Sequence, residues 1–295
     1  MLSTSPPIPH RLVLIRKPDL DTLTAALLAG VSPSRPLKVL PGLAEPEMLG
    51  DSSVLCLECG GSGRTAELNF DHHDCPEELP TAAEQVWEML GRPPAWKEWV
   101  DYTAWVDTAG RRGYGPPRAE AVTLSSLLSG LFLSRPETAE RFWLGLALLE
   151  EAAGCGRPPW DLTAALESRP AWRTWAEARG LAARALADSA ERVRRWQLRP
   201  GGPSPFLALS CPWPGVHGLL KGLGGAGRLA HREGGHFTLS VEPEYRAWLL
   251  SAAKFLNGLE PGWGGPAGGL ILGSPFGGSR FDFETLEALL SSAIL

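Results

Sequence analysis

Carboxylate and imidazole side chains follow three short apolar segments of this chain, and they carry its clearest chemical signal. An Asp-His-His tripeptide occupies residues 71–73, Asp19 and Asp21 follow an earlier apolar segment, and Glu58 ends another. Hard oxygen ligands combined with imidazole suit Mn²⁺, or else Mg²⁺ or Fe²⁺, better than they suit a metal that prefers soft ligands. Two such ions can clamp a phosphoryl group between them. These residue types therefore predict a site for one or two divalent ions.

The ligands can meet only if the apolar segments are neighbouring strands of one parallel sheet. Helices are expected at residues 21–30, capped by Asp21 or Thr22, and at 81–91, after a capping box. Strands that alternate with helices predict an α/β fold with a doubly wound, mainly parallel sheet, whose strand ends share one edge. The segments with strand composition are 11–16, 37–40, 53–58 and 66–70.

The rest of the chain predicts a helical middle segment and a second, smaller α/β domain. Apolar residues recur at helical spacing from Ala95 to about Leu198, and a stretch rich in Pro and Gly follows at 199–205. We therefore expect a first domain at 1–198 and a second at 206–295. The elements expected in the second domain are strands at 206–210, 236–242 and 269–272 and helices at 244–259 and 282–293.

Composition narrows the class of protein. The 295 residues carry a net charge of −5, which argues against a broadly basic surface that coats nucleic acid. No apolar run approaches the ~20 residues that span a bilayer, and the first residues lack the pattern of a signal peptide. Five scattered cysteines do not form a disulfide framework. We expect a cytoplasmic protein with no membrane segment; its oligomeric state stays open.

Two motifs together resemble the DHH phosphoesterase superfamily. They are Lys17-Pro18-Asp19-Leu20-Asp21 and Asp71-His72-His73, and Glu58-Cys59-Gly60-Gly61 before the second is similar to the Myg-type exonuclease branch. The superfamily includes RecJ-type exonucleases, nanoRNases, cyclic-dinucleotide phosphodiesterases and family II inorganic pyrophosphatases. The resemblance covers roughly the first 110 residues. It implies hydrolysis of a phosphoester by metal-activated water.

The resemblance also implies roles for individual residues. His73 would face the substrate phosphate, and Asp71 would orient a histidine. Asp101 is an alternative to Asp107, one helical turn or more before it. The implied ligands of one metal ion are Asp21, Glu58, His72 and Asp107.

A second metal site is where this chain departs from the superfamily. That site would use Asp19, a bridging carboxylate at Glu58 and a histidine four residues before Asp19, but Ile15 stands there. Glu58 also replaces the usual aspartate. An alternative therefore stays open: a degenerate DHH-like protein that binds a nucleotide or a partner without catalysis. The tripeptide could also be a capped turn with two solvated histidines.

Glycine-rich turns near the C-terminus are a second candidate for contact with phosphate. Their backbone amides can approach an anion closely, and Arg280 can form a charge-assisted pair with it. In DHH proteins a glycine-rich loop at this place in the chain binds substrate; the alternative is a set of tight turns around a buried strand. The candidate residues are Gly264, Gly265, Gly268, Gly269, Ser279 and Arg280.

Other features favour structural roles. Cys56 and Cys59 have the spacing of half a zinc or redox site but lack a partner pair, and Cys56, within a strand, is expected to be a small buried hydrophobic residue. Most tryptophans match helical core spacing, with Trp263 as the exception among glycines. Four arginines at 192–199 are expected at the end of a long helix, and His231 and His236 flank a hairpin turn.

The sequence thus favours a metal-dependent phosphoesterase. Its substrate would be a small phosphorylated molecule, such as a nucleotide, a short oligonucleotide or a cyclic dinucleotide, held between the two domains. Short single-stranded nucleic acid is a further candidate ligand. His73 and Arg280 would stabilise the charge that develops in the transition state.

Overall fold

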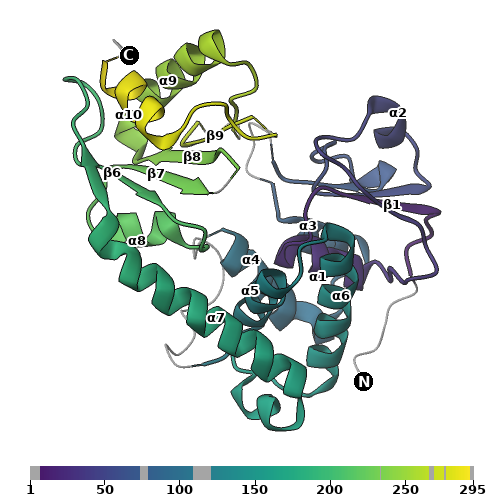
Figure 1. Ribbon diagram of the computed structural model, residues 1–295. Coiled ribbons are helices and arrows are strands. Elements are labelled where there is room, and N and C mark those ends of the chain that lie inside the picture. The colour runs from purple at the N-terminus through teal and green to yellow at the C-terminus, as the bar shows by residue number, and fades with distance from the viewer. Residues whose placement is uncertain are drawn as a thin grey trace. The chain divides into compact units, whose positions relative to one another are not determined.

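The computed structural model describes residues 7–73, 79–108, 121–232, 234–265, 269–275 and 277–292. The chain divides into two compact units, Met1–Arg179 and Gly180–Leu295 (Figure 1). The expected linker at 199–205 lies inside the second unit.

The first unit contains a parallel sheet of the kind that the sequence predicts. Its strand order is β2-β1-β3-β4, and every neighbouring pair is parallel. The order places the ends of β1, β3 and β4 next to one another, as the predicted site requires. The strands are β1 (Leu12–Ile15), β2 (Leu37–Val39), β3 (Val54–Leu57) and β4 (Asn69–Phe70).

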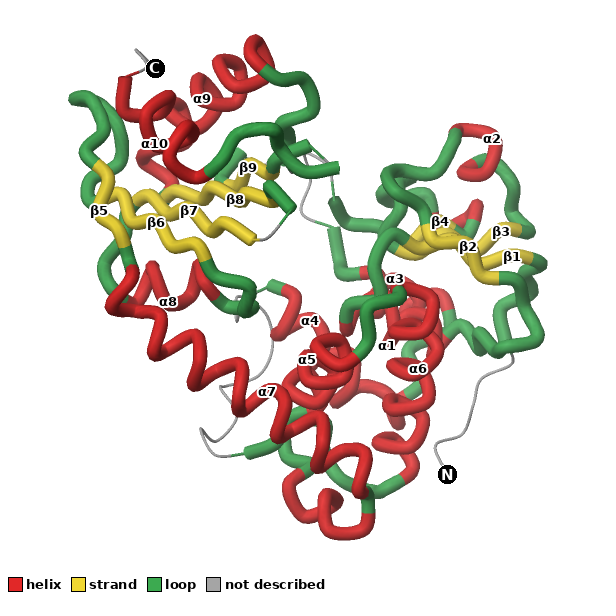
Figure 2. Tube along the Cα trace, viewed as in Figure 1, coloured by secondary structure: helices red, strands yellow, loops and turns green. Residues whose placement is uncertain are grey.

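Both faces of this sheet are covered, so the unit is doubly wound. Along β1, Val13 and Ile15 pack into one core and Leu14 packs into another, because side chains alternate along a strand. Figure 2 shows α2 (Pro46–Leu49) on one side of the sheet and α1 (Leu20–Leu28), α3 (Ala82–Met89) and α6 (Thr138–Gly154) on the other. Cys56 is fully buried on the α2 side, as expected, and Cys59 is fully buried in the same core.

Two predicted helix starts have different outcomes. The capping box is confirmed, because Thr81 and Glu84 satisfy each other's backbone amides at the start of α3. The expected cap at Asp21 or Thr22 is wrong: the carboxylate of Asp19 accepts the Thr22 amide. The helix begins at Leu20, so Asp21 lies in its first turn and the cap must lie before it.

The regular elements described between Pro94 and Arg192 are all helices. Helices α5 and α7 approach so closely that a Cβ at Gly130 would lie 1.8 Å from the Trp175 carbonyl oxygen. The expectation of helix through Leu198 is wrong, since Arg194–Trp196 forms strand β5, which pairs with β6 (Phe206–Ser210). The middle elements are η2 (Pro94–Trp96), α4 (Lys97–Asp107), α5 (Leu124–Ser134), α6, η3 (Thr163–Ser168), α7 (Pro170–Asp188) and η4 (Ser189–Arg192).

The second unit is built on a mixed sheet in the order β5-β6-β7-β8-β9. Only β6 and β7 are parallel; the other neighbours are antiparallel. The hairpin expected around Gly234 and Gly235 is confirmed as the connection from β7 to β8. The elements are β6 (Phe206–Ser210), α8 (Val216–Gly222), β7 (Gly227–Arg232), β8 (His236–Val241), η5 (Pro243–Tyr245), α9 (Arg246–Leu259), β9 (Ile271–Gly273) and α10 (Phe283–Ser292).

The two faces of this sheet carry separate cores. Leu229 and Phe237 pack with α9 and α10, whereas Ala230 packs with Val216 and Leu220 of α8. Figure 1 shows α8 on one side of the sheet and α9 and α10 on the other. Trp263 is buried beside Phe237, so the exception among the tryptophans is also a core residue.

The arginines at 192–199 do not gather at a helix end. Arg192 donates to Ser189, and Arg194 lies on β5, where it pairs with Glu284 and Glu287 of α10. Within the described parts of the chain, no helix combines the length and apolar composition needed to cross a membrane.

Candidate metal centre

Three adjacent strand ends of the first unit bring the predicted ligands together. Asp19 and Asp21 follow β1, Glu58 follows β3, and residues 71–73 follow β4. The Glu58 amide donates to the Phe70 carbonyl at 2.9 Å, which extends the β3–β4 pairing to the first residue of the site. The parallel strands therefore bring these acidic and histidine residues to one edge of the sheet, as the topology predicts.

His72 lies at the centre of the cluster. Its Nε2 atom is 3.4 Å from Glu58 Oε1, 3.3 Å from Asp107 Oδ2 and 3.8 Å from Asp21 Oδ2. Two groups have ligand atoms spaced for a cation: Asp21, His72 and Asp107, and Glu58, His72 and His73. Asp107 thus reaches the cluster from the end of α4, whereas Asp101 pairs with Lys97.

Glu58 has a backbone conformation that is unusual for its residue type. Its φ of +50° lies in the left-handed region, which costs a residue with a Cβ of order 1 kcal/mol. Oε2 accepts the Thr22 hydroxyl at 2.7 Å. Burial, together with the charge of Asp19, raises the pKa of Glu58 to about 7.

Asp21 is anchored by the first turn of α3. Its carboxylate accepts the amides of Ala82 at 2.7 Å and Ala83 at 2.9 Å. A carboxylate at a helix N-terminus is favoured by the helix dipole. Burial and the charges of Glu58 and Asp107 nevertheless raise the pKa of Asp21 well above its usual range.

A lysine stands close to the position of the second predicted metal site. The Lys17 ammonium lies 2.7 Å from the Asp19 carboxylate. Burial opposes the charge, but Asp19, with Glu58 and Asp107 beyond it, raises the pKa of Lys17 to about 12. Ile15 is fully buried in the core on the α1 side of the sheet and offers no ligand atom.

His73 is held by Asp71. Asp71 Oδ1 accepts the His73 amide at 2.8 Å and lies 2.9 Å from Nδ1, while Oδ2 accepts the Gly60 amide at 2.7 Å. The hydrogen bond that the His73 ring donates to Asp71 is the main reason why the pKa of His73 is raised. The turn that brings Gly60 here needs glycine at Gly61 as well, because its φ is +75° and a Cβ would meet Asn69 at 2.9 Å.

The donor set fits a divalent cation. Glu58 Oε1 and His72 Nε2 are buried and have no hydrogen-bond partner among the described residues. Such atoms are costly unless something satisfies them. Burial also raises the pKa of Asp107, and the charge of Asp19 acts in the same direction. One cation would satisfy both atoms and relieve the repulsion.

The candidate substrate-binding residues lie in the second unit. Gly264 exchanges backbone hydrogen bonds with Gly273, and a Cβ at Gly265 would lie 2.0 Å from the Ile271 carbonyl oxygen, so packing against β9 accounts for both glycines. Gly269 has a φ of +64°. Gly268 lies outside the described residues.

Ser279 and Arg280 are organised by one carboxylate. Glu260 accepts the Ser279 hydroxyl at 2.5 Å, the Arg280 amide at 2.8 Å and the Trp263 indole at 3.0 Å. The Arg280 guanidinium donates to the Leu259 carbonyl at 2.6 Å. These hydrogen bonds hold the loop in a defined conformation. Contact with substrate stays a prediction for these two residues and for the glycines.

Sequence reasoning missed several supports of the cluster. Thr22, which donates to Glu58, stands next to Asp21 in the chain, but a helix pattern does not say which side chain points at the sheet edge. The α3 amides could have been expected, because the capping box marks the helix start. Lys17 was part of the first motif, yet its pairing with Asp19 depends on the bend after β1.

Comparison with known proteins supports the fold. No family model matches the chain, and no curated protein matches it. Among solved structures, a pGpG-specific phosphodiesterase, PggH from Vibrio cholerae, is similar with a TM-score of 0.54 and 17% identity, covering 90% of this chain and 92% of that one. An uncharacterized protein from Helicobacter pylori matches with a TM-score of 0.34 and 14% identity, over 95% and 99% of the two chains. The chain therefore shares a two-unit α/β fold with PggH, and the predicted fold class is confirmed.

Proposed function

We propose that this chain is a metal-dependent phosphoesterase that hydrolyses a small phosphorylated substrate. The observation that carries the proposal is the cluster of Asp21, Glu58 and Asp107 around His72 Nε2, in which two buried atoms lack a hydrogen-bond partner among the described residues. Carboxylates and imidazole at adjacent strand ends are suited to a divalent ion that acts on a phosphate. The resemblance of the two motifs to DHH phosphoesterases points the same way.

The proposed centre holds one or two ions, with Mn²⁺ as the first candidate. One ion would be held by Asp21, Glu58, His72 and Asp107, and it would supply Lewis-acid chemistry for attack of water on phosphorus. A second ion, next to Asp19, would have to compete with the Lys17 ammonium for that carboxylate.

His73 and Lys17 supply positive charge from the chain itself. Because Asp71 engages Nδ1 of His73, Nε2 is the nitrogen free to donate a proton to a phosphate oxygen. The raised pKa of His73 favours the imidazolium that such donation needs. Asp71 acts as a positioning residue, since it fixes both the backbone and the ring of His73.

The candidate substrates are a nucleotide, a short oligonucleotide and a cyclic dinucleotide. PggH acts on pGpG, so a linear dinucleotide is the first compound to test. The assay is hydrolysis of pGpG, cyclic di-GMP, a nucleoside bisphosphate and inorganic pyrophosphate with Mn²⁺ by wild type, His72→Ala and Asp21→Asn. Loss of a metal ligand is expected to lower hydrolysis by about a hundredfold or more.

A matched control separates chemistry from folding. Asp101→Asn makes the same change as Asp21→Asn, but on an α4 side chain that pairs with Lys97 at the surface. It is expected to leave hydrolysis unchanged. Equal activity in wild type, His72→Ala and Asp21→Asn would contradict the proposal.

Ile15 favours a second candidate function. Without a histidine at that position, the chain could bind a nucleotide or a partner at the same cluster and turn nothing over. Tight binding of pGpG with no hydrolysis under any metal would support this alternative. Gain of hydrolysis in Ile15→His would indicate descent from an active enzyme.

A further inference from the structure

A second group of chemically capable side chains lines a cavity in the second unit. The cavity has a volume of about 800 Å³, within the range of small-molecule sites. His217, Arg232, His236 and Thr238 supply its polar lining, and Pro212 and Val216 supply apolar surface. None of the glycine-rich loop candidates that the structure describes lines it.

The topology of the sheet explains why the cavity exists. Ala230 pairs with Thr238, and Arg232 pairs with His236, so these four residues form two neighbouring cross-strand pairs on the face that α8 covers. Helix α8 is only 7 residues long, and it packs over Ala230 through Val216 and Leu220. The face beyond the helix therefore stays open at the end of the hairpin.

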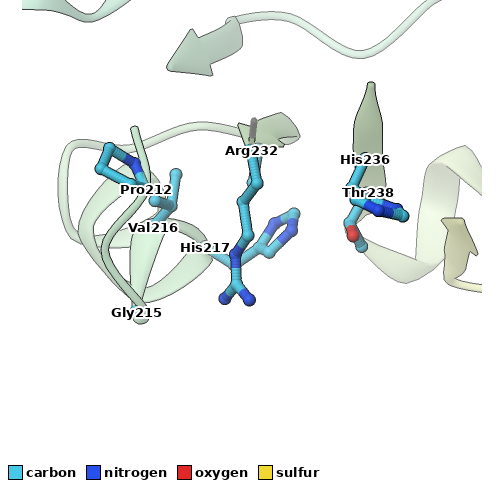
Figure 3. Close-up of a pocket in the computed structure, with 8 residues that line it drawn as sticks. Pro212, Gly215, Val216, His217, Arg232, His236 and Thr238 are labelled. Carbon is cyan, nitrogen blue, oxygen red and sulfur yellow. The ribbon is translucent and has the colours of Figure 1, made fainter. Parts of the chain in front are cut away.

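Positive charge and hydrogen-bond donors gather on this open face. Figure 3 shows the Arg232 side chain beside the His217 ring, with His236 and Thr238 on the other side of the cavity. No carboxylate of the described residues pairs with Arg232.

The hydrogen bonds behind His217 fix what it offers to the cavity. The buried Arg228 guanidinium donates Nε–H to Ser240 Oγ at 3.0 Å, and it is neutralised by Glu242 at 2.5 Å. The Ser240 hydroxyl lies 2.9 Å from His217 Nδ1, so it can accept from Arg228 and donate its own hydrogen to Nδ1.

When Nδ1 of His217 accepts from Ser240, the ring has one nitrogen left to act as a donor. Burial, with the charges of Arg228 and Arg232, lowers the pKa of His217 to about 4, so the ring is neutral. With Nδ1 accepting, the single ring proton lies on Nε2. This atom is buried and has no partner among the described residues, so it awaits an acceptor.

We propose that this cavity, lined by His217, Arg232 and His236, binds the phosphate group of a small organic phosphate. The charged head would lie against Arg232 and His236 and accept the His217 Nε2–H, because phosphate oxygens are strong acceptors for guanidinium and imidazole donors. The organic part would pack on the apolar side, at Pro212 and Val216. This site does not depend on the proposed hydrolysis.

The test is calorimetric titration in EDTA, which removes any metal-dependent binding. The probes are GMP, inorganic phosphate and guanosine, titrated into wild type, Arg232→Gln and Arg232→Glu. GMP is expected to bind wild type, guanosine is expected not to bind, and Arg232→Gln should weaken GMP by about ten- to a hundredfold. Tighter binding of GMP than of phosphate would show that the apolar side of the cavity contributes to affinity. Equal binding of the two would show that the cavity recognises the phosphate group alone. Either result would support a phosphate site in this cavity.

A charge-removing control variant and an NMR measurement of His217 complete the test. Lys254→Gln removes a positive charge from exposed α9, on the opposite face of the sheet, and should bind GMP as wild type does. In nitrogen NMR spectra His217 should carry its proton on Nε2, and GMP should shift that resonance. Absence of GMP binding at millimolar concentration, or equal binding by wild type and Arg232→Glu, would overturn the proposal.

Discussion

Replacing Asp71 with asparagine would test how the centre positions His73. The Asp71 side chain is only 2% exposed, and its two oxygens face three N–H groups: the amides of Gly60 and His73 and the His73 ring. Asparagine offers one acceptor oxygen and one NH₂ group. In either orientation the NH₂ group faces a backbone donor, and burial leaves no water to compensate.

The magnitude follows from those contacts. One buried N–H without an acceptor costs about 1–3 kcal/mol, and a charged acceptor is lost as well, so we expect Asp71→Asn to destabilise the first unit by about 2–3 kcal/mol. For a unit of this size that corresponds to a fall in Tm of about 4–10 °C. Scanning calorimetry in EDTA measures it without a contribution from metal.

The same substitution at Asp101 provides the comparison. Its ion pair with Lys97 is an i,i+4 surface pair on α4, worth about 0.3–0.5 kcal/mol. Asp101→Asn should therefore shift Tm by no more than about 2 °C. If the two variants melted at the same temperature, the inference that Asp71 gathers three donors would be refuted.

Three further predictions concern separate features. Thr22→Val removes the hydroxyl that donates to Glu58 Oε2, and it should cost about 1–3 kcal/mol in urea unfolding, whereas an unchanged midpoint would show that the contact contributes nothing. Gly130→Ala should destabilise the fold by about 2 kcal/mol or more, because its Cβ would lie 1.8 Å from the Trp175 carbonyl oxygen. Gly154→Ala, with open space around it, should leave the stability unchanged. Equal unfolding midpoints for the two variants would contradict the close approach of α5 and α7. The pKa of His217 is lowered from 6.5 to about 4, so this residue contributes stability that is present above pH 6.5 and lost as pH falls toward 4. Wild type should therefore lose about 3 kcal/mol more than His217→Gln over that range, and parallel pH curves would refute the assignment.

The strands and their chemistry could be predicted where local pattern and topology agree. β1 and β3 are short, fully apolar runs followed by carboxylates, and parallel pairing necessarily aligns their ends. Each apolar run forms a strand, and the end of the strand fixes the position of the carboxylate residue that follows it, Asp19 or Glu58. This is why the edge of the sheet could be expected from residue types alone.

Other elements depend on partners that local sequence does not reveal. β7 consists of Gly, Arg, Leu, Ala, His and Arg, with no β-branched residue, and it is a strand because β6 and β8 lie on either side of it. β5 has three residues whose composition suits a helix equally well, and its pairing with β6 decides the matter. The cavity beside α8 was missed for the same reason, since it depends on the pairing of Arg232 with His236.

The left-handed conformation of Glu58 was also beyond prediction. A glutamate gives no indication of a positive φ, and only the nearby Gly60-Gly61 pair indicates a tight turn. That turn brings Glu58 within reach of Thr22 and His72 together. Contacts of this kind come from tertiary structure and not from spacing.

The metal content of the purified protein would show directly whether the cluster around His72 binds a divalent ion. Wild type, His72→Ala and His236→Ala would be loaded with Mn²⁺, freed of excess and analysed for manganese per chain. His236 is an exposed histidine outside the cluster and serves as the matched control. We predict at least one ion per chain in wild type and in His236→Ala, and its loss in His72→Ala. Wild type without manganese, or His72→Ala with as much manganese as wild type, would contradict binding of a divalent ion by the cluster around His72.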